Sequence, residues 1–332
     1  ETSPEFLETF YACQYAGLVP APMPMPVNLG GKDGYINQIR QMIAGAKAAA
    51  AIGPETLREF LEEASGNGAM AQVMSYGDLE ALEDTGEPQR FGPDDYCYIQ
   101  YSSGSTSAPK GVIGLQRSVC ANLTAIARDG MYLQPGDRAT SWLPLYHDMG
   151  LIGFVLTPMT TQVSVDFLAT SDFVRRPLLW LRIMTDNKST ITYSPSFGYD
   201  LAAKRSARAE PGAIDLKALR VAGIGGDMVR PEALKAFADA FGPVGFNRNA
   251  FMPSYGMAEA TLAISFPELG APVMVDEVDM RHYTRSGVAQ PASALTSPEH
   301  KRGFVLCGRA LPGHAIEVRS EAGEPCGERQ VG

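Results

Sequence analysis

Hydrophobic residues recur at helical spacing in three segments of the first quarter of the chain. The first segment starts at Phe6 and leads into a proline-bearing apolar run, "GLVPAPMPMP". The second segment has its hydrophobic positions at Tyr35, Ile36, Ile39, Met42 and Ile43. A small strand-like run at 48–52 follows it, and the third segment is marked by Leu57, Phe60 and Leu61.

Further along the chain, strand-like and helical patterns alternate. "DYCYIQY" is aromatic and β-prone, and "ATSWLP", "STITYS" and "LRVAGIG" are also typical of strands. "SVCANLTAIA" and "DFVRRPLLWLRIM" predict helices, and "RPEALKAFADAFG" has a proline near its first turn and a glycine after its last. This alternation predicts an α/β protein with a parallel sheet covered by helices on both faces. Ligands of such sheets bind beyond the carboxyl ends of the strands.

The pattern changes near the end of the chain. Residues 267–302 are polar and contain prolines, which indicates a long insertion or linker. "GFVLCG" and "HAIEVRS" then alternate in the manner of antiparallel strands. We expect the insertion to lie on the surface, anchored at most by Val275, Val278, Met280 and Tyr283, although its composition equally fits a disordered linker.

The composition is that of an ordinary globular protein, and its charge narrows the function classes. Of 332 residues, 45% are hydrophobic and 20% are charged, which suits a chain with well-buried cores. The net charge of −9 argues against broad contact with nucleic acid. Any phosphate site must therefore be a local arrangement in an acidic chain.

Cysteine spacing and hydropathy indicate a cytoplasmic protein. The odd number of well-separated cysteines favours reduced thiols over a disulfide framework, and no apolar run is long enough to cross a bilayer. No signal peptide opens the chain, but its start reads as the inside of a domain, so we expect a fragment. The cysteines are Cys13, Cys97, Cys120, Cys307 and Cys326.

The segment "QYSSGSTSAPKGV" at 100–112 has the composition of an anion-binding loop. Small residues let several backbone N–H groups converge, hydroxyls add donors, and Lys110 supplies a point charge suited to phosphate. The P-loop pattern does not fit, because Pro109 stands where its second glycine should be and Gly111 follows the lysine. Taken alone, the segment could equally be a solvated turn.

Three later stretches accompany this loop, and the set resembles the adenylate-forming enzymes, which include acyl-CoA synthetases, luciferase and peptide-synthetase adenylation domains. The stretches are "SWLPLYHDMGLIG", "VAGIGGDMVRPE" and "FMPSYGMAEATLAIS". "PLYHDMGLIG", "YSPSFGYDLAAKR", "PSYGMAEATL" and "CGRALPGHAIEV" are similar to the fatty acyl-AMP ligase branch in particular. The resemblance covers essentially the whole chain.

The resemblance implies a specific architecture. We expect two stacked, mostly parallel α/β subdomains at 1–139 and 140–302, the second including the insertion at 267–302. The start of a small β-barrel is expected at 303–332. Family members continue with an aspartate that binds the ribose hydroxyls, a hinge and a C-terminal domain with a catalytic lysine. The sequence stops at "GERQVG", before these features.

The resemblance also assigns roles to residues of the phosphate side. Lys110 and the loop would hold the β- and γ-phosphates of ATP, and Lys110, Thr106 and His147 would be catalytic. His147 would lie beside the substrate carboxylate and orient it, although a histidine in this context is often a core or capping residue. For Asp148 we prefer capping of the following helix. The loop residues assigned to the nucleotide are Ser102, Ser103, Gly104, Ser105 and Thr106.

On the adenine side, Tyr255 would stack on the base and Glu259 would bind Mg²⁺, since one carboxylate plus phosphate oxygens suits this ion. Two residues depart from the family pattern: Ala258 stands in place of the usual threonine, an exchange also seen in the acyl-AMP ligase branch, and Asp227 stands where that branch usually has a glutamate that faces the adenine. Residues 196–199 and 149–154 could line an acyl tunnel, with ordinary core almost equally plausible. The assigned adenine-side residues are Gly225, Gly226, Asp227, Ser254, Tyr255, Gly256, Met257, Ala258 and Glu259.

The activity that the resemblance implies is ATP- and Mg²⁺-dependent conversion of a long-chain fatty acid to acyl-AMP and pyrophosphate. The acyl group would pass to an acyl carrier protein or a polyketide synthase carrier domain. One alternative is a long-chain acyl-CoA synthetase, which the long segment at 267–304 disfavours. Another is a non-catalytic module that binds acyl groups or nucleotide, which the intact Lys110, His147 and Glu259 disfavour.

Overall fold

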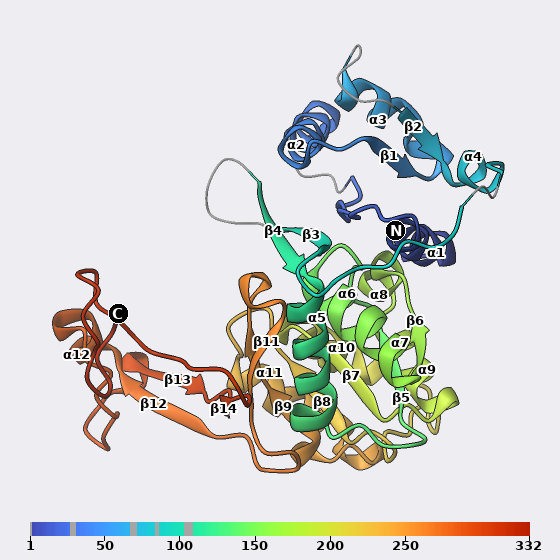
Figure 1. Cartoon of the computed structure of the whole chain (residues 1–332). Helices are drawn as coiled ribbons and strands as arrows, with labels where there is room; N and C mark the ends of the chain where they lie inside the picture. The colour runs from blue at the N-terminus through green and yellow to red at the C-terminus, as the bar shows by residue number, and fades with distance from the viewer. Residues whose placement is uncertain (1, 27–30, 67–71, 84–85, 103–108) are drawn as a thin grey trace. The chain divides into compact units, whose positions relative to one another are not determined.

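The computed structural model describes residues 2–26, 31–66, 72–83, 86–102 and 109–332 (Figure 1). These residues form two compact units. The first unit comprises Glu1–Leu123, Leu143–Thr160 and Ala258–Leu262, and the second comprises Thr124–Trp142, Thr161–Met257 and Ala263–Gly332. The domain boundaries expected after residues 139 and 302 stay a prediction.

The first unit contains a parallel strand pair and an antiparallel strand pair. β1 and β2 pair in parallel with α3 between them in the chain, whereas β3 and β4 pair antiparallel. The phosphate loop therefore connects a hairpin and not a strand and helix of a parallel sheet. The elements are α1 Pro4–Tyr15, α2 Gly31–Ala46, β1 Ala50–Gly53, η1 Glu55–Leu57, α3 Arg58–Ser65, β2 Gln72–Ser75, α4 Tyr76–Glu80, β3 Tyr96–Ser102, β4 Lys110–Leu115, α5 Gln116–Thr124, α6 Asp148–Leu151, the π-helical turn η3 Ile152–Leu156, α7 Thr157–Thr161 and η7 Ala258–Ala260.

The hydrophobic positions predicted for the second helical segment form the core of the N-terminal part of this unit. All five are buried on one side of α2, together with Leu57 and Leu61 from η1 and α3. Tyr101 of β3 joins the same cluster and donates its hydroxyl hydrogen to the carbonyl of Met42. β3, which leads into the phosphate loop, is thereby fixed to α2.

The second unit is built on a five-stranded sheet with the order β6-β5-β7-β8-β9, and all its neighbouring pairs are parallel. This confirms the α/β class. The unit contains η2 Ala125–Gly130, β5 Arg138–Ser141, β6 Ser164–Phe167, α8 Thr170–Arg175, α9 Pro177–Asn187, β7 Ile191–Ser194, α10 Ser196–Arg205, η4 Ser206–Arg208, β8 Val221–Ile224, α11 Pro231–Phe241, η5 Gly242–Val244, η6 Arg248–Ala250, β9 Phe251–Pro253, β10 Tyr255–Gly256, β11 Ala263–Phe266, β12 Val275–Asp279, α12 Met280–Ser286, η8 Pro298–His300, β13 Lys301–Val305 and β14 Arg309–Ala310.

Three helices pack beside one another in this unit: α10 contacts both α9 and α11 (Figure 1). Trp180, Tyr199 and Phe237, one from each helix, are fully buried and contact one another edge to face or at a tilt. The Trp180 indole donates to Thr192 Oγ1 at 3.0 Å and the Tyr199 hydroxyl donates to the Gly223 carbonyl at 3.0 Å. Both bonds tie the helices to strands of the sheet, since buried polar groups require partners.

The C-terminal part differs from expectation in two respects. "GFVLCG" contributes to β13, which pairs antiparallel with β12, but "HAIEVRS" forms only an isolated bridge between Arg319 and Pro325. Alternation alone does not make a strand when the backbone has no ladder partner. The insertion, for its part, is folded around β12, α12 and η8. Of its expected anchors, Val278 is buried and Val275 is exposed.

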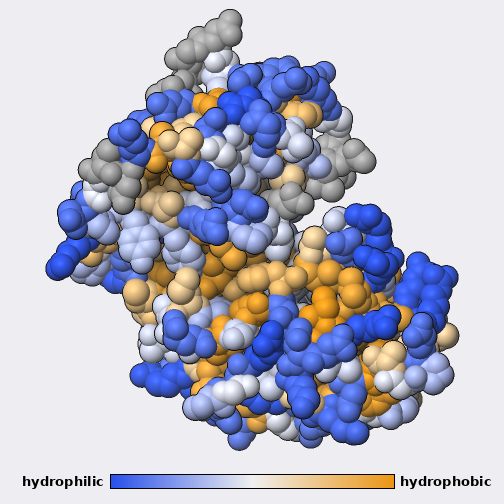
Figure 2. Space-filling view, turned by 90° about the vertical axis from the view of Figure 1, so that its right-hand side faces the viewer, coloured by the Kyte–Doolittle hydropathy of each residue, from blue (hydrophilic) through white to orange (hydrophobic). Residues whose placement is uncertain are grey.

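Hydrophilic residues cover much of the face in Figure 2, and hydrophobic residues gather in patches between them. Large exposed apolar side chains occur in both units, so exposed apolar surface does not by itself mark a site. Within the described part of the chain, no helix combines the length and apolar character needed to cross a bilayer. All five cysteines lie among the described residues, and none of them forms a disulfide.

Candidate active site

In the second unit, three neighbouring strands end at one edge of the parallel sheet. β7, β8 and β9 lie side by side in this order and point the same way. The segments after them carry Ser196, the loop 225–227, and Ser254 with Tyr255. Because ligands bind beyond the carboxyl ends of such strands, this edge is a suitable place for a nucleotide base. The structure brings two separate groups of expected adenine-side residues together here.

The loop after β8 is held by the start of α10. The Ser196 N–H donates to Asp227 Oδ1 at 3.2 Å, and Ser196 Oγ donates to the Met228 carbonyl at 3.2 Å and accepts from the Arg230 N–H at 3.1 Å. Gly226 has a φ of +79°, a conformation that favours glycine. Asp227 thus caps the N-terminus of α10, where a negative charge is stabilised.

The sequence pattern indicated Ser196 only as part of an acyl tunnel and missed its positioning role. Ser196 is fully buried, and its neighbour Tyr199 lies in the core, as do Leu151 and Ile152 of the first unit. Phe197, in contrast, is 45% exposed. The available signal was a serine that follows a proline directly after the predicted strand "STITYS", a pattern typical of a helix start.

Ser254 and Tyr255 have different surroundings. The Ser254 N–H and Oγ both donate to the Ile224 carbonyl, at 2.8 and 3.3 Å, which fastens this residue to the end of β8. Tyr255 lies in β10 opposite Ser265 of β11, and 46% of its surface is exposed. Gly256 and Met257 are also exposed. A tyrosine ring on a strand with solvent access can stack on a planar ligand.

In the first unit, Lys110 is the first residue of β4 and not part of an irregular loop. It is exposed, and its partner in the antiparallel ladder is Ser102, the last residue of β3. The ladder fixes the lysine backbone at the point where the phosphate loop rejoins regular structure. The loop residues Ser103, Gly104, Ser105 and Thr106 lie outside the described residues.

His147 stands at the start of α6, in a turn that is linked to β3. The buried Gln100 side chain donates from Nε2 to the carbonyl of Tyr146. The His147 N–H donates to the Pro144 carbonyl at 3.2 Å, and the His147 carbonyl accepts from the Leu151 N–H at 2.8 Å. Solvent reaches the imidazole, yet the protein around it desolvates the ring enough to lower its pKa, an effect that Asp148 opposes. A neutral imidazole can accept or donate a hydrogen bond without repelling a cation.

Asp148 and Glu259 form a second feature of this unit. Burial raises the pKa of Asp148, and the negative charge of Glu259 adds to this rise, whereas the Met149 N–H and His147 oppose it. Asp148 Oδ1 accepts from that N–H at 2.7 Å in the first turn of α6, which agrees with the helix-start interpretation, although the cap position itself is His147. Glu259 is exposed in the short η7 turn, which contacts β4. The strand of Lys110 and the turn of Glu259 are therefore neighbours.

Comparisons with known proteins show the family of the chain and agree with its fold. The family model described as "AMP-binding enzyme" matches residues 1–332. A solved structure from a study of fatty acyl-adenylate ligases from E. coli and L. pneumophila is 43% identical with a TM-score of 0.92, over 99% of this chain and 58% of that one. A fatty acid AMP ligase structure from Legionella pneumophila is 25% identical with a TM-score of 0.84, over 99% of this chain and 56% of that one.

Two relatives known by name bear on the reaction. A Caulobacter vibrioides protein with the provisional name acyl-CoA synthetase is 47% identical over 100% of this chain and 58% of its own length. A medium-chain-fatty-acid–[acyl-carrier-protein] ligase of Moorena producens is 28% identical over 95% of this chain and 53% of its own length. The chain thus spans little more than half the length of these relatives.

Proposed function

The chain belongs to the AMP-binding enzyme family, and we propose that the full-length protein activates a fatty acid with ATP. In this reaction a carboxylate oxygen of the fatty acid bonds to the α-phosphorus while the bond from that phosphorus to the bridging oxygen breaks. The products are acyl-AMP and pyrophosphate. The acyl group then passes to the thiol of a carrier protein, and AMP leaves.

The observation that carries this proposal is the likeness to the fatty acyl-adenylate ligase structure over 99% of the chain. The site geometry supports it. Ser196 and Asp227 organise the sheet edge expected to receive the adenine, and Tyr255 is exposed there. In the first unit, Lys110, His147 and Glu259 are all exposed, as groups that contact a substrate must be.

Each of these residues has a proposed task. Lys110 offsets the charge that develops on pyrophosphate, and the β-ladder fixes the backbone position from which its side chain reaches the phosphates. His147 orients the fatty acid carboxylate by a hydrogen bond from its neutral ring. Tyr255 stacks on the adenine. The reaction asks little covalent chemistry of the protein, so positioning supplies much of the rate.

Magnesium fits this site only with help from the nucleotide. Among the described residues, no group of three or more His, Cys, Asp or Glu side chains is arranged to hold a metal ion. Mg²⁺ commonly takes one or two carboxylates and completes its shell with phosphate oxygens and water. Glu259, whose negative charge already acts on Asp148, is the proposed protein ligand. When bound, the ion would neutralise phosphate charge.

The proposal is tested with full-length protein, ATP and a fatty acid. We expect fatty-acid-dependent exchange of labelled pyrophosphate into ATP, and thioester formation on an added carrier protein but not on CoA. Absence of exchange would overturn the proposal and favour a non-catalytic binding module. The Glu259→Gln variant removes the carboxylate charge of the proposed Mg²⁺ ligand and keeps nearly the same side-chain shape.

An acyl-CoA synthetase is the second candidate, and the name of the Caulobacter relative favours it. The insertion bears on this choice. It is held to the second unit by the β12–β13 ladder and by an ion pair of 2.8 Å between Arg329 and Asp276, and Thr296 Oγ1 donates to Asp279 Oδ2 at 3.1 Å within the insertion itself. A segment anchored in this way could restrain a C-terminal domain against the movement that thioester formation with CoA requires.

Shortening the insertion separates the two candidates. Replacing residues 281–299 by a short turn keeps β12 and β13, so the ladder can still form. We expect acyl-AMP formation to persist and acyl-CoA to appear. If the shortened enzyme forms acyl-AMP but no acyl-CoA, the restraint is absent. If the intact enzyme already forms acyl-CoA freely, the carrier-specific assignment is wrong.

A further inference from the structure

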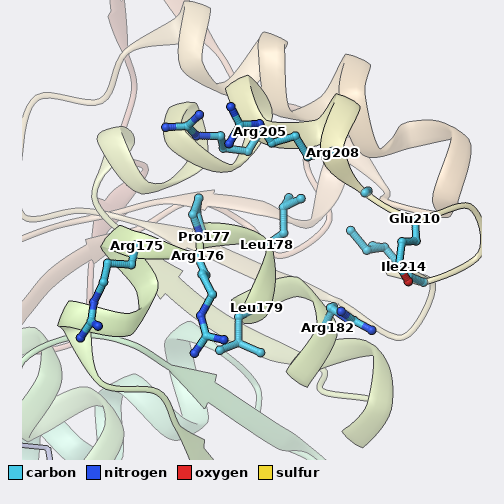
Figure 3. Close-up of a pocket in the computed structure, with 12 residues that line it drawn as sticks. Arg175, Arg176, Pro177, Leu178, Leu179, Arg182, Arg205, Arg208, Glu210 and Ile214 are labelled. Carbon is cyan, nitrogen blue, oxygen red and sulfur yellow. The ribbon is translucent and has the colours of Figure 1, made fainter.

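A cavity of about 300 Å³ lies in the second unit, where α8 and α9 meet the end of α10, the η4 turn and residues 209–214 (Figure 3). Its size is at the lower end of the range for small-molecule sites. Ser196, which organises the sheet edge, begins α10, whereas the cavity is at its other end. Ten helical residues rise about 15 Å, so the two places are separate. The cavity has six charged lining residues, Arg175, Arg176, Arg182, Arg205, Arg208 and Glu210.

Five arginines around one cavity are unexpected in a chain of net charge −9. Arg175 and Arg176 share Asp172, at 3.6 and 3.9 Å. Within the described part of the chain, neither Arg182 nor Arg205 nor Arg208 forms an ion pair, although Glu210 lies nearby.

Helix electrostatics account for only part of this set. Arg175 and Arg205 are in the last turns of α8 and α10, where a positive charge is stabilised by the helix dipole. Arg182 lies in the interior of α9, and Arg208 ends the three-residue η4 turn, which has a negligible dipole. The helix dipole therefore does not explain why Arg182 and Arg208, which are both exposed, stand at this cavity.

The floor of the cavity is apolar. Pro177 and Ile214 are buried, and Leu178 is half-buried between them. In Figure 3, Leu178 lies between the edge with Arg205 and Arg208 and the side with Arg176, and Arg182 is on the side of Ile214. A ligand that fits this lining has an anionic group for the arginines and an apolar part for the floor.

We propose that this cavity binds a small organic phosphate, with its phosphate on Arg205 and Arg208 and its apolar part on Leu178. Guanidinium groups pair with phosphate through two parallel hydrogen bonds, which makes arginine well suited to this anion. Both arginines are exposed and lie at the edge of one helical segment, so one phosphate can reach both. The proposal is independent of the activity proposed above.

The test is calorimetric titration of the chain with hexyl phosphate and, separately, with inorganic pyrophosphate. All titrations are made in a Lys110→Ala background, which removes the cation of the expected catalytic phosphate site. We expect hexyl phosphate to bind, and the Arg205→Gln/Arg208→Gln double variant to weaken it about tenfold or more, since hydrogen bonds to charged groups are lost. The Leu178→Ser variant should weaken hexyl phosphate but leave pyrophosphate unchanged.

The matched control is Arg281→Gln/Arg285→Gln, which removes the same charge from two exposed arginines on α12. Circular dichroism and thermal unfolding verify that each variant folds. Pyrophosphate binding that depends on Arg205 and Arg208, without any gain from the hexyl chain, would identify inorganic phosphate as the ligand and overturn the organic part. Equal losses in the control pair, or no binding in the Lys110→Ala background, would overturn the site.

Discussion

Replacing Gly150 with alanine should displace the turn that carries His147. A Cβ at this position would lie 2.3 Å from the Pro144 carbonyl oxygen and 2.9 Å from its carbon, and both atoms belong to the backbone. Real Cβ atoms do not approach so closely, so either α6 or the 144–147 turn must shift by about 1 Å to restore van der Waals contact. Because the His147 N–H bonds to that same Pro144 carbonyl, the imidazole moves with the turn.

The magnitude follows from two effects. Overpacking of this kind costs about 1–3 kcal/mol of folding stability. A displacement of about 1 Å at a positioning group can cost about a hundredfold in rate. We therefore expect Gly150→Ala in the full-length enzyme to unfold at lower urea concentration and to form acyl-AMP roughly ten to a hundred times more slowly.

Gly77→Ala is the matched control. Gly77 is also helical and in the same unit, but a Cβ there would meet only Ser75 Oγ, at an ordinary 3.7 Å. Helix propensity predicts a gain of up to about 1 kcal/mol for this variant, with unchanged activity. Wild-type stability and pyrophosphate exchange in Gly150→Ala would refute the proposed contact between α6 and the turn. A loss of stability with full activity would refute the role of His147.

Three other changes test separate features. Lys110→Ala in the full-length enzyme should lower the kcat/KM of pyrophosphate exchange, because about 2–4 kcal/mol of transition-state stabilisation is lost. Lys188→Ala should leave this kcat/KM unchanged. The lowered pKa of His147 predicts that the acid limb of kcat/KM, which reports the free enzyme, lies below the ordinary value of about 6.5. His147→Gln should abolish that limb, and a limb above about 6.5 would contradict the prediction. Arg220→Met should destabilise the protein by about 3 kcal/mol in urea, because Asp137, whose side chain is only 4% exposed, loses the partner of a buried ion pair. Burial raises the pKa of Asp137, but hydrogen bonds from Arg220, the Gln134 N–H and Thr190 outweigh burial and lower it below its ordinary value. The stabilising contribution of Asp137 is therefore present above the ordinary value of about 3.9 and is lost as the pH falls from there through the lowered folded-state pKa. Asp137→Asn should remove this pH dependence.

The sequence predicted an element well where its hydrophobic pattern is compatible with only one kind of secondary structure. The hydrophobic residues of α2 and the strand pattern of β7 and β8 appear in the structure with the burial expected of them. The pairing of strands was harder to predict from the sequence. Nothing in "DYCYIQY" itself shows that β3 pairs antiparallel with β4, because the partner strand lies on the other side of the phosphate loop in the chain. For the same reason the alternation in "HAIEVRS" predicted a strand that the fold does not pair.

Sequence motifs predict the candidate site residues, but they do not predict the residues that hold those side chains in position. Lys110, His147, Tyr255 and Glu259 stand in recognisable segments, whereas Gln100 acts through a hydrogen bond to a carbonyl 46 residues away. Gly150 likewise acts by lacking a side chain near the Pro144 carbonyl. Supports of this kind depend on tertiary distance and carry no signal in residue type or spacing.

Net charge illustrates how a global quantity can mislead about a local one. The value of −9 argues against a surface that binds nucleic acid along its length. It says nothing about an ion that contacts a few residues, because screening confines each charge to a neighbourhood of about 8–10 Å at physiological salt. Arg182, Arg205 and Arg208 are spread over two helical segments in the sequence, and only the packing of α9 against α10 gathers them at one cavity. An acidic chain can therefore still present a cationic pocket, provided that the fold brings several arginines together.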